Sequence, residues 1–112
     1  MSELKKIESP GEHIATFETD ELTAFCPFDF GGPDFYTLKI KYTPSEYIIE
    51  SKSLKEYFAT YRDEEITAEA LGVQIHEDIL DTISPKECYV CLEQSRRGGI
   101  EEKVEVGDCD LS

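Results

Sequence analysis

The chain has 112 residues, with 25 Asp and Glu against 11 Lys and Arg, for a formal charge of −14 at pH 7. This acidity disfavours nucleic acid as the main ligand, because affinity for nucleic acid comes largely from cationic contacts to phosphate. No apolar run approaches transmembrane length, and the N-terminus lacks the apolar core of a signal peptide. We therefore expect one cytoplasmic domain whose four cysteines are reduced.

The first part of the chain predicts an arm followed by two strands. Residues 1–11 are polar and end in Ser-Pro-Gly, which indicates a flexible arm ahead of a domain over residues 12–107. Apolar and polar residues alternate over 13–19 and over 35–43, as in half-buried strands. The second of these strands is expected to bury Tyr36, Leu38, Ile40 and Tyr42 on one face.

The middle of the chain predicts two helices. Residues 47–50 form a short extended piece that leads into the first helix, for which Ser51 or Ser53 is the expected cap. The second helix starts near Thr67 and ends at about Ile83. The apolar face of the first helix comprises Leu54, Tyr57, Phe58 and Tyr61, and that of the second Ala68, Leu71, Ile75, Ile79 and Ile83.

The last third predicts two more strands, over residues 88–92 and 100–106, joined by residues 96–99 and followed by a tail at 108–112. Two hairpins separated by a helical pair make an α+β domain, with an antiparallel sheet and both helices on one of its faces. Because nothing in the sequence caps the sheet edges, edge-to-edge assembly into a ring or barrel is expected.

The segment from Cys26 to Asp34 is rich in proline and glycine, so it forms a shaped loop rather than a helix or strand. It places a thiol at one end and a carboxyl group at the other, a usable pair of nucleophile and proton donor. The alternative is a turn that buries a small hydrophobic cysteine. The sequence leaves open whether Asp29 or Asp34 lies nearer the thiol.

Two further segments carry groups suited to ligands. Glu50, at a strand end, can accept two hydrogen bonds from a guanine-like edge, and Ser51 and Lys52 follow at a helix N-terminus that favours phosphate. The alternative is a capped amphipathic helix with solvated lysines. Residues 96–99 pair two guanidinium groups with flexible glycines, which suits phosphate, although a charged hairpin loop explains them equally well.

The remaining cysteines and histidines do not predict a metal site. Cys88 and Cys91 lie three apart on a strand, so they point to opposite faces, and no second pair completes a zinc site. Cys109 lies in the tail. His76 is expected on the solvated side of the second helix, without a partner.

Several segments together resemble the 7-cyano-7-deazaguanine (preQ0) reductases, the QueF-type nitrile reductase family of queuosine tRNA modification. They are residues 21–27, 32–35, 49–57 and 97–100, and the resemblance spans roughly residues 13–105 in order. The most specific block is Glu-Ser-Lys-Ser-Leu-Lys at 50–55. The resemblance implies the T-fold, whose subunits assemble into barrel homo-oligomers with active sites between subunits.

The resemblance also implies roles for individual residues. Cys26 would attack the nitrile carbon to form a covalent thioimide, and Asp34 would donate the proton. Two hydride transfers from NADPH would then give the aminomethyl product. The positions that match substrate-binding ones are Ile49, Glu50, Ser51 and Glu69, and those that match NADPH-binding ones are Ser51, Lys52, Arg97 and Gly98.

Two departures from the family pattern leave alternatives open. The loop at residues 26–34 is one residue longer than the family's, and Ala68 stands where the family has a histidine before Glu69. One alternative is a QueF-like archaeosine synthase, an amidinotransferase that resolves the thioimide with ammonia on a base already in tRNA. The other is a noncatalytic T-fold that binds purines. Retention of both Cys26 and Asp34 favours an enzyme.

Overall fold

The computed structural model describes residues 3–28, 33–97 and 99–112, without the side chains of 96 and 97. The predicted order of two strands, two helices and two strands is confirmed, with two short strands and a 3-10 helix in addition. In chain order the elements are β1 (Lys6–Glu8), β2 (Ala15–Ala24), β3 (Asp34–Thr43), β4 (Tyr47–Ile49), α1 (Ser51–Ala59), α2 (Ala68–Ile83), β5 (Glu87–Arg97), β6 (Ile100–Gly107) and η1 (Cys109–Leu111).

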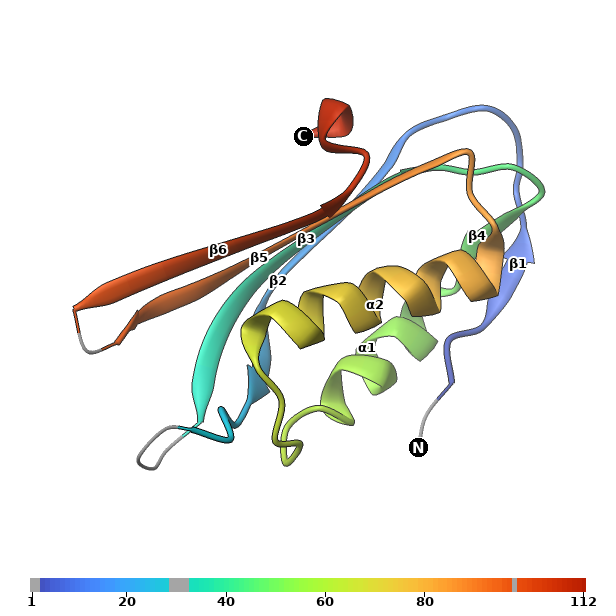
Figure 1. Cartoon of the computed structure of the whole chain (residues 1–112). Coiled ribbons are helices and arrows are strands. Elements are labelled where there is room, and N and C mark those ends of the chain that lie inside the picture. Colours follow the sequence, from blue (N-terminus) through green and yellow to red (C-terminus); the bar gives the residue numbers. More distant parts are fainter. Residues whose placement is uncertain (1–2, 29–32, 98) are drawn as a thin grey trace.

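The main sheet is antiparallel and has the strand order β2-β3-β5-β6. Both helices lie against the same face of this sheet, as predicted (Figure 1). β1 and β4 pair with each other in a separate two-stranded sheet. The described part of the chain is therefore an α+β domain in which β2 and β6 form the two edges of the main sheet.

The core lies between this face of the sheet and the helices. On β3, every second side chain from Tyr36 to Tyr42 is buried, and α2 buries the stripe that the 3.6-residue spacing predicts. Burial of these side chains is the main stabilising contribution to such a layer. The least exposed members of the core are Leu22, Tyr36, Leu38, Ile40, Tyr42, Leu71, Ile75, Ile79, Ile83, Val90 and Leu92.

The two helices begin differently. Thr67 caps α2 as expected, with its hydroxyl accepting a hydrogen bond from the Ala70 N–H at 3.2 Å. The expected serine cap of α1 is wrong, because Glu50 occupies that position and its carboxylate accepts from the Lys52 and Ser53 N–H groups at 2.7 and 2.8 Å. Ser53 is held away from this role, since its hydroxyl donates to the Glu50 carbonyl at 2.7 Å.

The N-terminal segment differs from the expected flexible arm at residues 6–8, which form β1. Its residues pair with β4 in antiparallel register, with Ile7 opposite Ile48. Lys5 extends the contact, because its N–H donates to the Ser53 hydroxyl at 2.9 Å. Three residues carry too little periodicity to predict a strand, and the pairing depends on an edge that only the folded chain presents.

Three predicted strands are longer in the structure than their alternation indicated. β2 continues to Ala24 past a register shift between Thr19 and Leu22, which interrupts the pattern. β3 begins at Asp34, and β5 extends from Glu87 to Arg97. The extension of β2 and β3 brings Asp34 opposite Ala24 at the base of the loop.

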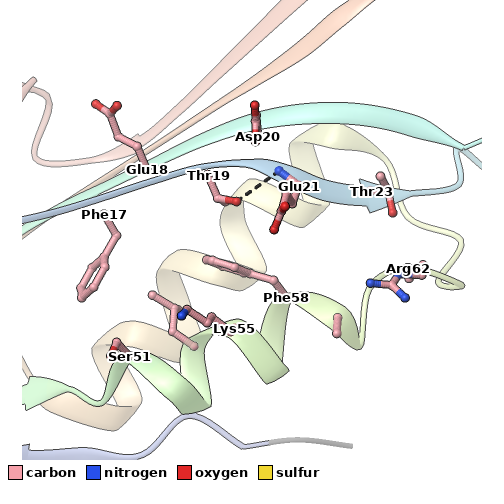
Figure 2. A pocket seen from close by; sticks show the side chains of 12 residues that line it. Phe17, Glu18, Thr19, Asp20, Glu21, Thr23, Ser51, Lys55, Phe58 and Arg62 are labelled. Carbon is pink, nitrogen blue, oxygen red and sulfur yellow. Dashed lines mark hydrogen bonds between the residues drawn. The ribbon is translucent and has the colours of Figure 1, made fainter.

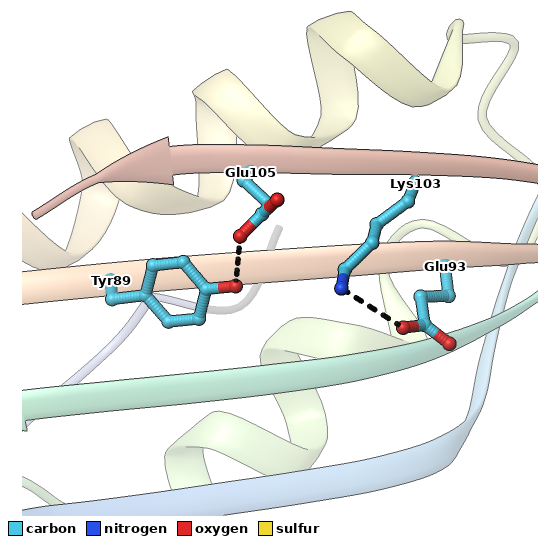
Figure 3. A network of polar contacts seen from close by, with 4 residues as sticks. All are labelled: Tyr89, Glu93, Lys103 and Glu105. Carbon is cyan, nitrogen blue, oxygen red and sulfur yellow. Dashed lines mark hydrogen bonds and ion pairs between the residues drawn. The ribbon is translucent and has the colours of Figure 1, made fainter. Parts of the chain in front are cut away.

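The other face of the sheet carries polar contacts between β5 and β6. The Tyr89 hydroxyl donates a hydrogen bond to Oε2 of Glu105 at 2.6 Å, and Nζ of Lys103 lies 3.8 Å from Oε1 of Glu93 (Figure 3). Cys91 is buried on this face, whereas Cys88 is buried on the helix face, so the prediction of opposite faces is confirmed. Within the described ranges, no His, Cys, Asp and Glu side chains cluster as metal ligands.

His76 does not face solvent as expected but packs on the end of β6. A Cβ atom at Gly107 would meet the His76 ring and the Cys88 carbonyl, and Gly107 has a φ of +93°. A glycine is thus needed both for its backbone conformation and for the space that the imidazole occupies. Among the residues described, no helix is long and apolar enough to cross a membrane.

Candidate functional site

The backbone around Cys26 is held against the segment that enters α2. The Phe25 N–H donates to the Glu64 carbonyl at 2.8 Å, and the Ile66 N–H donates to the Phe25 carbonyl at 2.7 Å. These two bonds form an isolated bridge between Phe25 and Glu65. They place the half-buried Cys26 beside the start of α2, two residues past the last pair of β2 and β3.

Asp34 is the first residue of β3, and only 2% of it is exposed. Because Asp34 pairs with Ala24 in the β2–β3 ladder, it lies at the same end of this hairpin as Cys26. Burying a carboxyl group is costly unless polar partners compensate, so such positions are more common at functional sites than in ordinary cores. Asp29, the other candidate of the loop, lies outside the described residues.

Tyr36 follows Asp34 on the helix-facing side of β3 and is 2% exposed. Its hydroxyl oxygen has no hydrogen-bond partner among the described residues. Burial raises the pKa of this hydroxyl, and the nearby Asp34, Cys26, Glu102 and Glu69 raise it further. The Tyr36 hydroxyl is therefore a neutral O–H group among four acidic groups from four segments of the chain.

Glu69 and Glu102 complete this group of residues. Glu69 lies in the first turn of α2, and its carboxyl group is hydrogen-bonded to that of Glu102 on β6. This bond lowers the pKa of Glu69 and raises that of Glu102, so a proton held by the pair resides on Glu102, whose O–H then donates to the Glu69 carboxylate. Two carboxyl groups that share one proton are a way to hold like charges together.

We call Cys26, Asp34, Tyr36, Glu69 and Glu102 the carboxyl cluster. It unites three residues that the sequence singled out, because Cys26, Asp34 and Glu69 all act on the same buried hydroxyl. The sequence reasoning missed the other two. Tyr36 fitted the core pattern, while Glu102 fell on the same face as Val104 and Val106, and a charged residue at a core-facing position was the available signal.

The second predicted group of site residues lies around the start of α1. Ile49 is buried, and its N–H donates to the Tyr42 hydroxyl at 3.1 Å, so its side chain belongs to the core. Both carboxylate oxygens of Glu50 accept backbone hydrogen bonds of α1, which lowers the pKa of Glu50. Ser51 and Lys52 are exposed and accessible to a ligand.

A groove of about 400 Å³ runs between β2 and α1, beside Ser51 (Figure 2). Lys55 and Arg62 line it together with Ser51, on one side of the helical segment, and Phe17 and Phe58 supply an apolar surface. The sequence analysis assigned no role to Lys55, which lies one turn after Ser51 on α1, or to Arg62, which follows the end of α1. Glu18, Asp20 and Glu21 of β2 also line the groove, although Glu18 and Asp20 point away from α1 in this view.

Within one chain, the carboxyl cluster and the Glu50–Lys52 segment are not brought together. The first turn of α1 begins at Ser51, and the segment that follows α1 reaches Phe25, so the two groups lie toward opposite ends of this helix (Figure 1). The remaining predicted residues are Arg97, whose backbone ends β5, and Gly98. The Arg97 side chain and Gly98 lie outside the described residues.

Comparison with known families identifies the chain. The family model of the QueF-like proteins matches residues 33–112, which is most of the chain. The chain belongs to the QueF-like protein family. The resemblance stated from the sequence motifs is therefore confirmed, and the matched region includes Asp34, Tyr36, Glu69 and Glu102 of the carboxyl cluster.

Named relatives lie within the same family. The chain is 45% identical over 94 residues to the NADPH-dependent 7-cyano-7-deazaguanine reductase of Syntrophus aciditrophicus, covering 84% of this chain and 66% of that protein. It is 35% identical over 105 residues to the protein of the same name from Thermomicrobium roseum, covering 91% of this chain and 81% of the relative. The chain thus spans about two thirds to four fifths of these relatives.

A solved structure shares the fold. The apo form of an archaeosine synthase QueF-Like superposes with a TM-score of 0.75, at 22% sequence identity, covering 90% of this chain and 96% of that one. At this identity the likeness concerns the fold. Together with the antiparallel sheet and its two helices, it confirms the α+β T-fold expected from the sequence.

Proposed function

We propose that this QueF-like protein is an NADPH-dependent oxidoreductase that reduces the nitrile of 7-cyano-7-deazaguanine to an aminomethyl group, in the queuosine pathway of tRNA modification. The single observation that carries the proposal is that the half-buried Cys26, the buried Asp34 and the exposed Glu69 gather around the buried Tyr36 hydroxyl. The names of the relatives at 35–45% identity support the same activity.

The chemistry begins at Cys26. Its sulfur adds to the nitrile carbon, so that a C–S bond forms and the C≡N triple bond becomes a C=N double bond. Asp34 donates a proton to the nitrogen, which gives a neutral thioimide, and the thiol proton leaves to the surroundings of the site. NADPH, when bound, would supply the two hydrides that complete the reduction, in the course of which the C–S bond breaks and the Cys26 thiol is released. A buried carboxyl group next to a thiol suits this step, because it can move a proton where water has limited access.

In this proposal, Glu69 and Glu50 bind the base of the substrate. The Glu69 carboxylate accepts hydrogen bonds from the N–H groups of the guanine-like edge, which presents donors that a carboxylate matches. Glu50 offers a second carboxylate. Its backbone bonds hold its oxygens at the start of α1, so it contributes to substrate binding through the remaining lone pairs, together with Ser51 and the backbone of Ile49.

The residues at the β2–α1 groove fit the phosphates of NADPH. One groove is lined by the Ser51 hydroxyl, the Lys55 ammonium and the Arg62 guanidinium. Lys52 is exposed in the first turn of α1. Cations and hydroxyl groups in this arrangement bind phosphate oxygens. Arg97 and Gly98 belong to the cofactor site by their match to the family motif.

We further propose that the active site forms between subunits of a homo-oligomer. The carboxyl cluster and the Glu50–Lys52 segment lie toward opposite ends of α1 in one chain, so a complete site requires the cluster of one copy and the segment of another. The open edges of β2 and β6 offer the surfaces for a barrel of T-fold domains, each comprising residues 12–107. A cytoplasmic location fits four cysteines that are all free thiols.

The test combines 7-cyano-7-deazaguanine and NADPH with the protein and follows the cofactor absorbance together with the intact mass. We expect NADPH consumption and, without NADPH, an adduct of the base on Cys26. Cys26→Ala should abolish both. The matched control is Cys109→Ala, which removes an exposed thiol outside the cluster and should leave both signals intact.

Other outcomes contradict the proposal in distinct ways. An adduct on Cys26 without NADPH consumption, followed by resolution with ammonia, would indicate an archaeosine synthase that acts on tRNA. The absence of any adduct and of any turnover would indicate a noncatalytic T-fold. An adduct that survives Cys26→Ala would show that another thiol reacts. Cys88 is a poor candidate for that role, because burial raises the pKa of its thiol to about 12.

A further inference from the structure

The Tyr36 hydroxyl is the polar group of the carboxyl cluster whose role the proposed function does not use. Tyr36 is 2% exposed, and its oxygen has no hydrogen-bond partner within the described ranges. A buried hydroxyl without a partner is destabilising, typically by about 1–3 kcal/mol. Phenylalanine would fill the same space without this cost, so the hydroxyl needs an explanation outside the free protein.

The surroundings of this hydroxyl restrict what its partner can be. The groups that act on it are Asp34 on its own strand, Cys26 after β2, Glu69 on α2 and Glu102 on β6. Ionised carboxylates accept hydrogen bonds and cannot donate them. Because burial and the acidic groups around it raise its pKa, the Tyr36 hydroxyl remains protonated. It can therefore donate a hydrogen bond to an acceptor atom that the carboxylates would repel.

The proposed substrate carries such an acceptor at the matching place. Around the perimeter of 7-cyano-7-deazaguanine, the N–H donors of the guanine edge come first, then the carbonyl oxygen on carbon 6, then the cyano group on carbon 7. In the cluster, Glu69 suits the donors, and Cys26 and Asp34 suit the cyano group. The Tyr36 hydroxyl lies within electrostatic reach of all three, so it is available to the carbonyl between them.

We propose that the Tyr36 hydroxyl donates a hydrogen bond to the 6-carbonyl oxygen of the bound deazaguanine base and so determines specificity for 6-oxo over 6-deoxo bases. This inference rests on the proposed function, because it assumes that a deazaguanine base occupies the cluster. It assigns Tyr36 a binding role only, and no bond forms or breaks at its oxygen.

The experiment measures equilibrium binding by calorimetry on the full chain in the Cys26→Ala background, where no covalent adduct forms. The ligands are 7-cyano-7-deazaguanine and its analogue without the 6-oxygen, 2-amino-7-cyano-7-deazapurine. Removing the 6-oxygen also turns N1 from an N–H donor into an acceptor, so the analogue loses a hydrogen bond to Glu69 as well, and we expect the 6-oxo base to bind more than about tenfold tighter. Adding Tyr36→Phe should reduce this preference about tenfold by weakening the 6-oxo base, should leave binding of the analogue unchanged, and should leave the part of the preference that comes from N1.

Tyr42→Phe in the same background is the matched control, because it removes another buried hydroxyl from the same face of β3. It should retain the preference for the 6-oxo base, since the Tyr42 hydroxyl accepts from Ile49 at the other end of the strand. The melting temperature of the ligand-free protein should stay unchanged or rise with Tyr36→Phe. A fall would show that the hydroxyl already has a structural partner, and would overturn the inference.

The remaining outcomes separate this inference from the proposed function. If the preference for the 6-oxo base is undiminished after Tyr36→Phe, another donor serves the carbonyl and the inference fails while the proposed function stands. If neither base binds and the unmodified protein forms no adduct on Cys26, the proposed function fails and the inference fails with it. Equal binding of both bases before Tyr36 is changed also overturns the inference.

Discussion

The buried face of β3 has a tyrosine toward each end, and the two hydroxyl groups differ. Tyr42 accepts a hydrogen bond from the Ile49 N–H at 3.1 Å and thereby fixes β4 ahead of α1. Tyr36 has no such partner in the described part of the chain and lies among four acidic groups. At one end of the domain the tyrosine hydroxyl has a partner within the fold, and at the other end it is left for the ligand that we propose.

The same difference separates Glu50 from the glutamates of the carboxyl cluster. Both oxygens of Glu50 accept backbone N–H groups, which lowers its pKa. Glu69 and Glu102 instead bond to each other, and this raises the pKa of Glu102. A carboxylate that satisfies a helix end stabilises the fold, whereas two carboxyl groups in contact are stable only while they share a proton.

The largest expected effect is on catalysis at the cluster end. Asp34→Asn keeps the shape of the buried side chain but removes its proton, so we expect the rate of NADPH oxidation to fall by about 10²–10⁴-fold. Circular dichroism should show a folded protein. Asp110→Asn, in the exposed η1, is the matched control and should keep its rate. A near-normal rate for Asp34→Asn would mean that another group donates the proton.

The next effect is on stability and tests the two tyrosines directly. Tyr42→Phe leaves the buried Ile49 N–H without its acceptor, so we expect it to lower the free energy of unfolding by about 1–3 kcal/mol. Tyr36→Phe should be neutral or stabilising. Urea denaturation of both variants measures the difference. Equal losses for the two substitutions would contradict the contrast drawn between the ends of β3.

A smaller effect concerns the pH dependence at the Glu50 end. The pKa of Glu50 is lowered in the folded state, so its contribution to stability is present above its ordinary pKa and is lost as the pH falls through the folded value. The melting temperature of Glu50→Gln should therefore lie below that of the unmodified protein at neutral pH and approach it in acid. A constant difference between the two would exclude this linkage.

The smallest effect has the opposite sign and concerns Glu102. Its pKa is raised in the folded state, so its contribution is complete below its ordinary pKa of about 4.5 and is lost as the pH rises through the folded value. Glu102→Gln supplies a permanent N–H donor to Glu69. The melting temperature of Glu102→Gln, relative to that of the unmodified protein, should rise as the pH increases from mildly acidic to neutral. A difference in melting temperature that does not change with pH would contradict the shared proton.

Much of the site could be predicted because certain residue types are rarely placed together by chance. Cys26 and Asp34 bracket a loop of prolines and glycines, which carried the signal for them, whereas Glu69 was singled out only by the resemblance to the family. The roles of Tyr36 and Glu102 could not be found in this way. Tyr36 continued an apolar face, and its function depends on what lies opposite its hydroxyl after β5, β6 and α2 have packed.

The Glu50 segment shows the reverse case. The sequence suggested a carboxylate open to a ligand and a serine cap, while the structure uses Glu50 as the cap and leaves Ser51 exposed. Both readings rest on the same local spacing, since Glu50 and Ser51 are neighbours at a strand end. Backbone geometry decided between them, because only the residue with extended φ and ψ, here Glu50, can occupy the capping position.

The sequence by itself determined the order of the long strands and the two helices, the α+β class and the family, because alternation, helical spacing and short motifs are properties of neighbouring residues. Only the tertiary structure decided which acidic groups meet around Tyr36, that β1 pairs with β4, and that the cluster and the start of α1 stand apart in one chain. These depend on contacts between residues distant in the chain, whose local patterns do not record which partner each side chain meets.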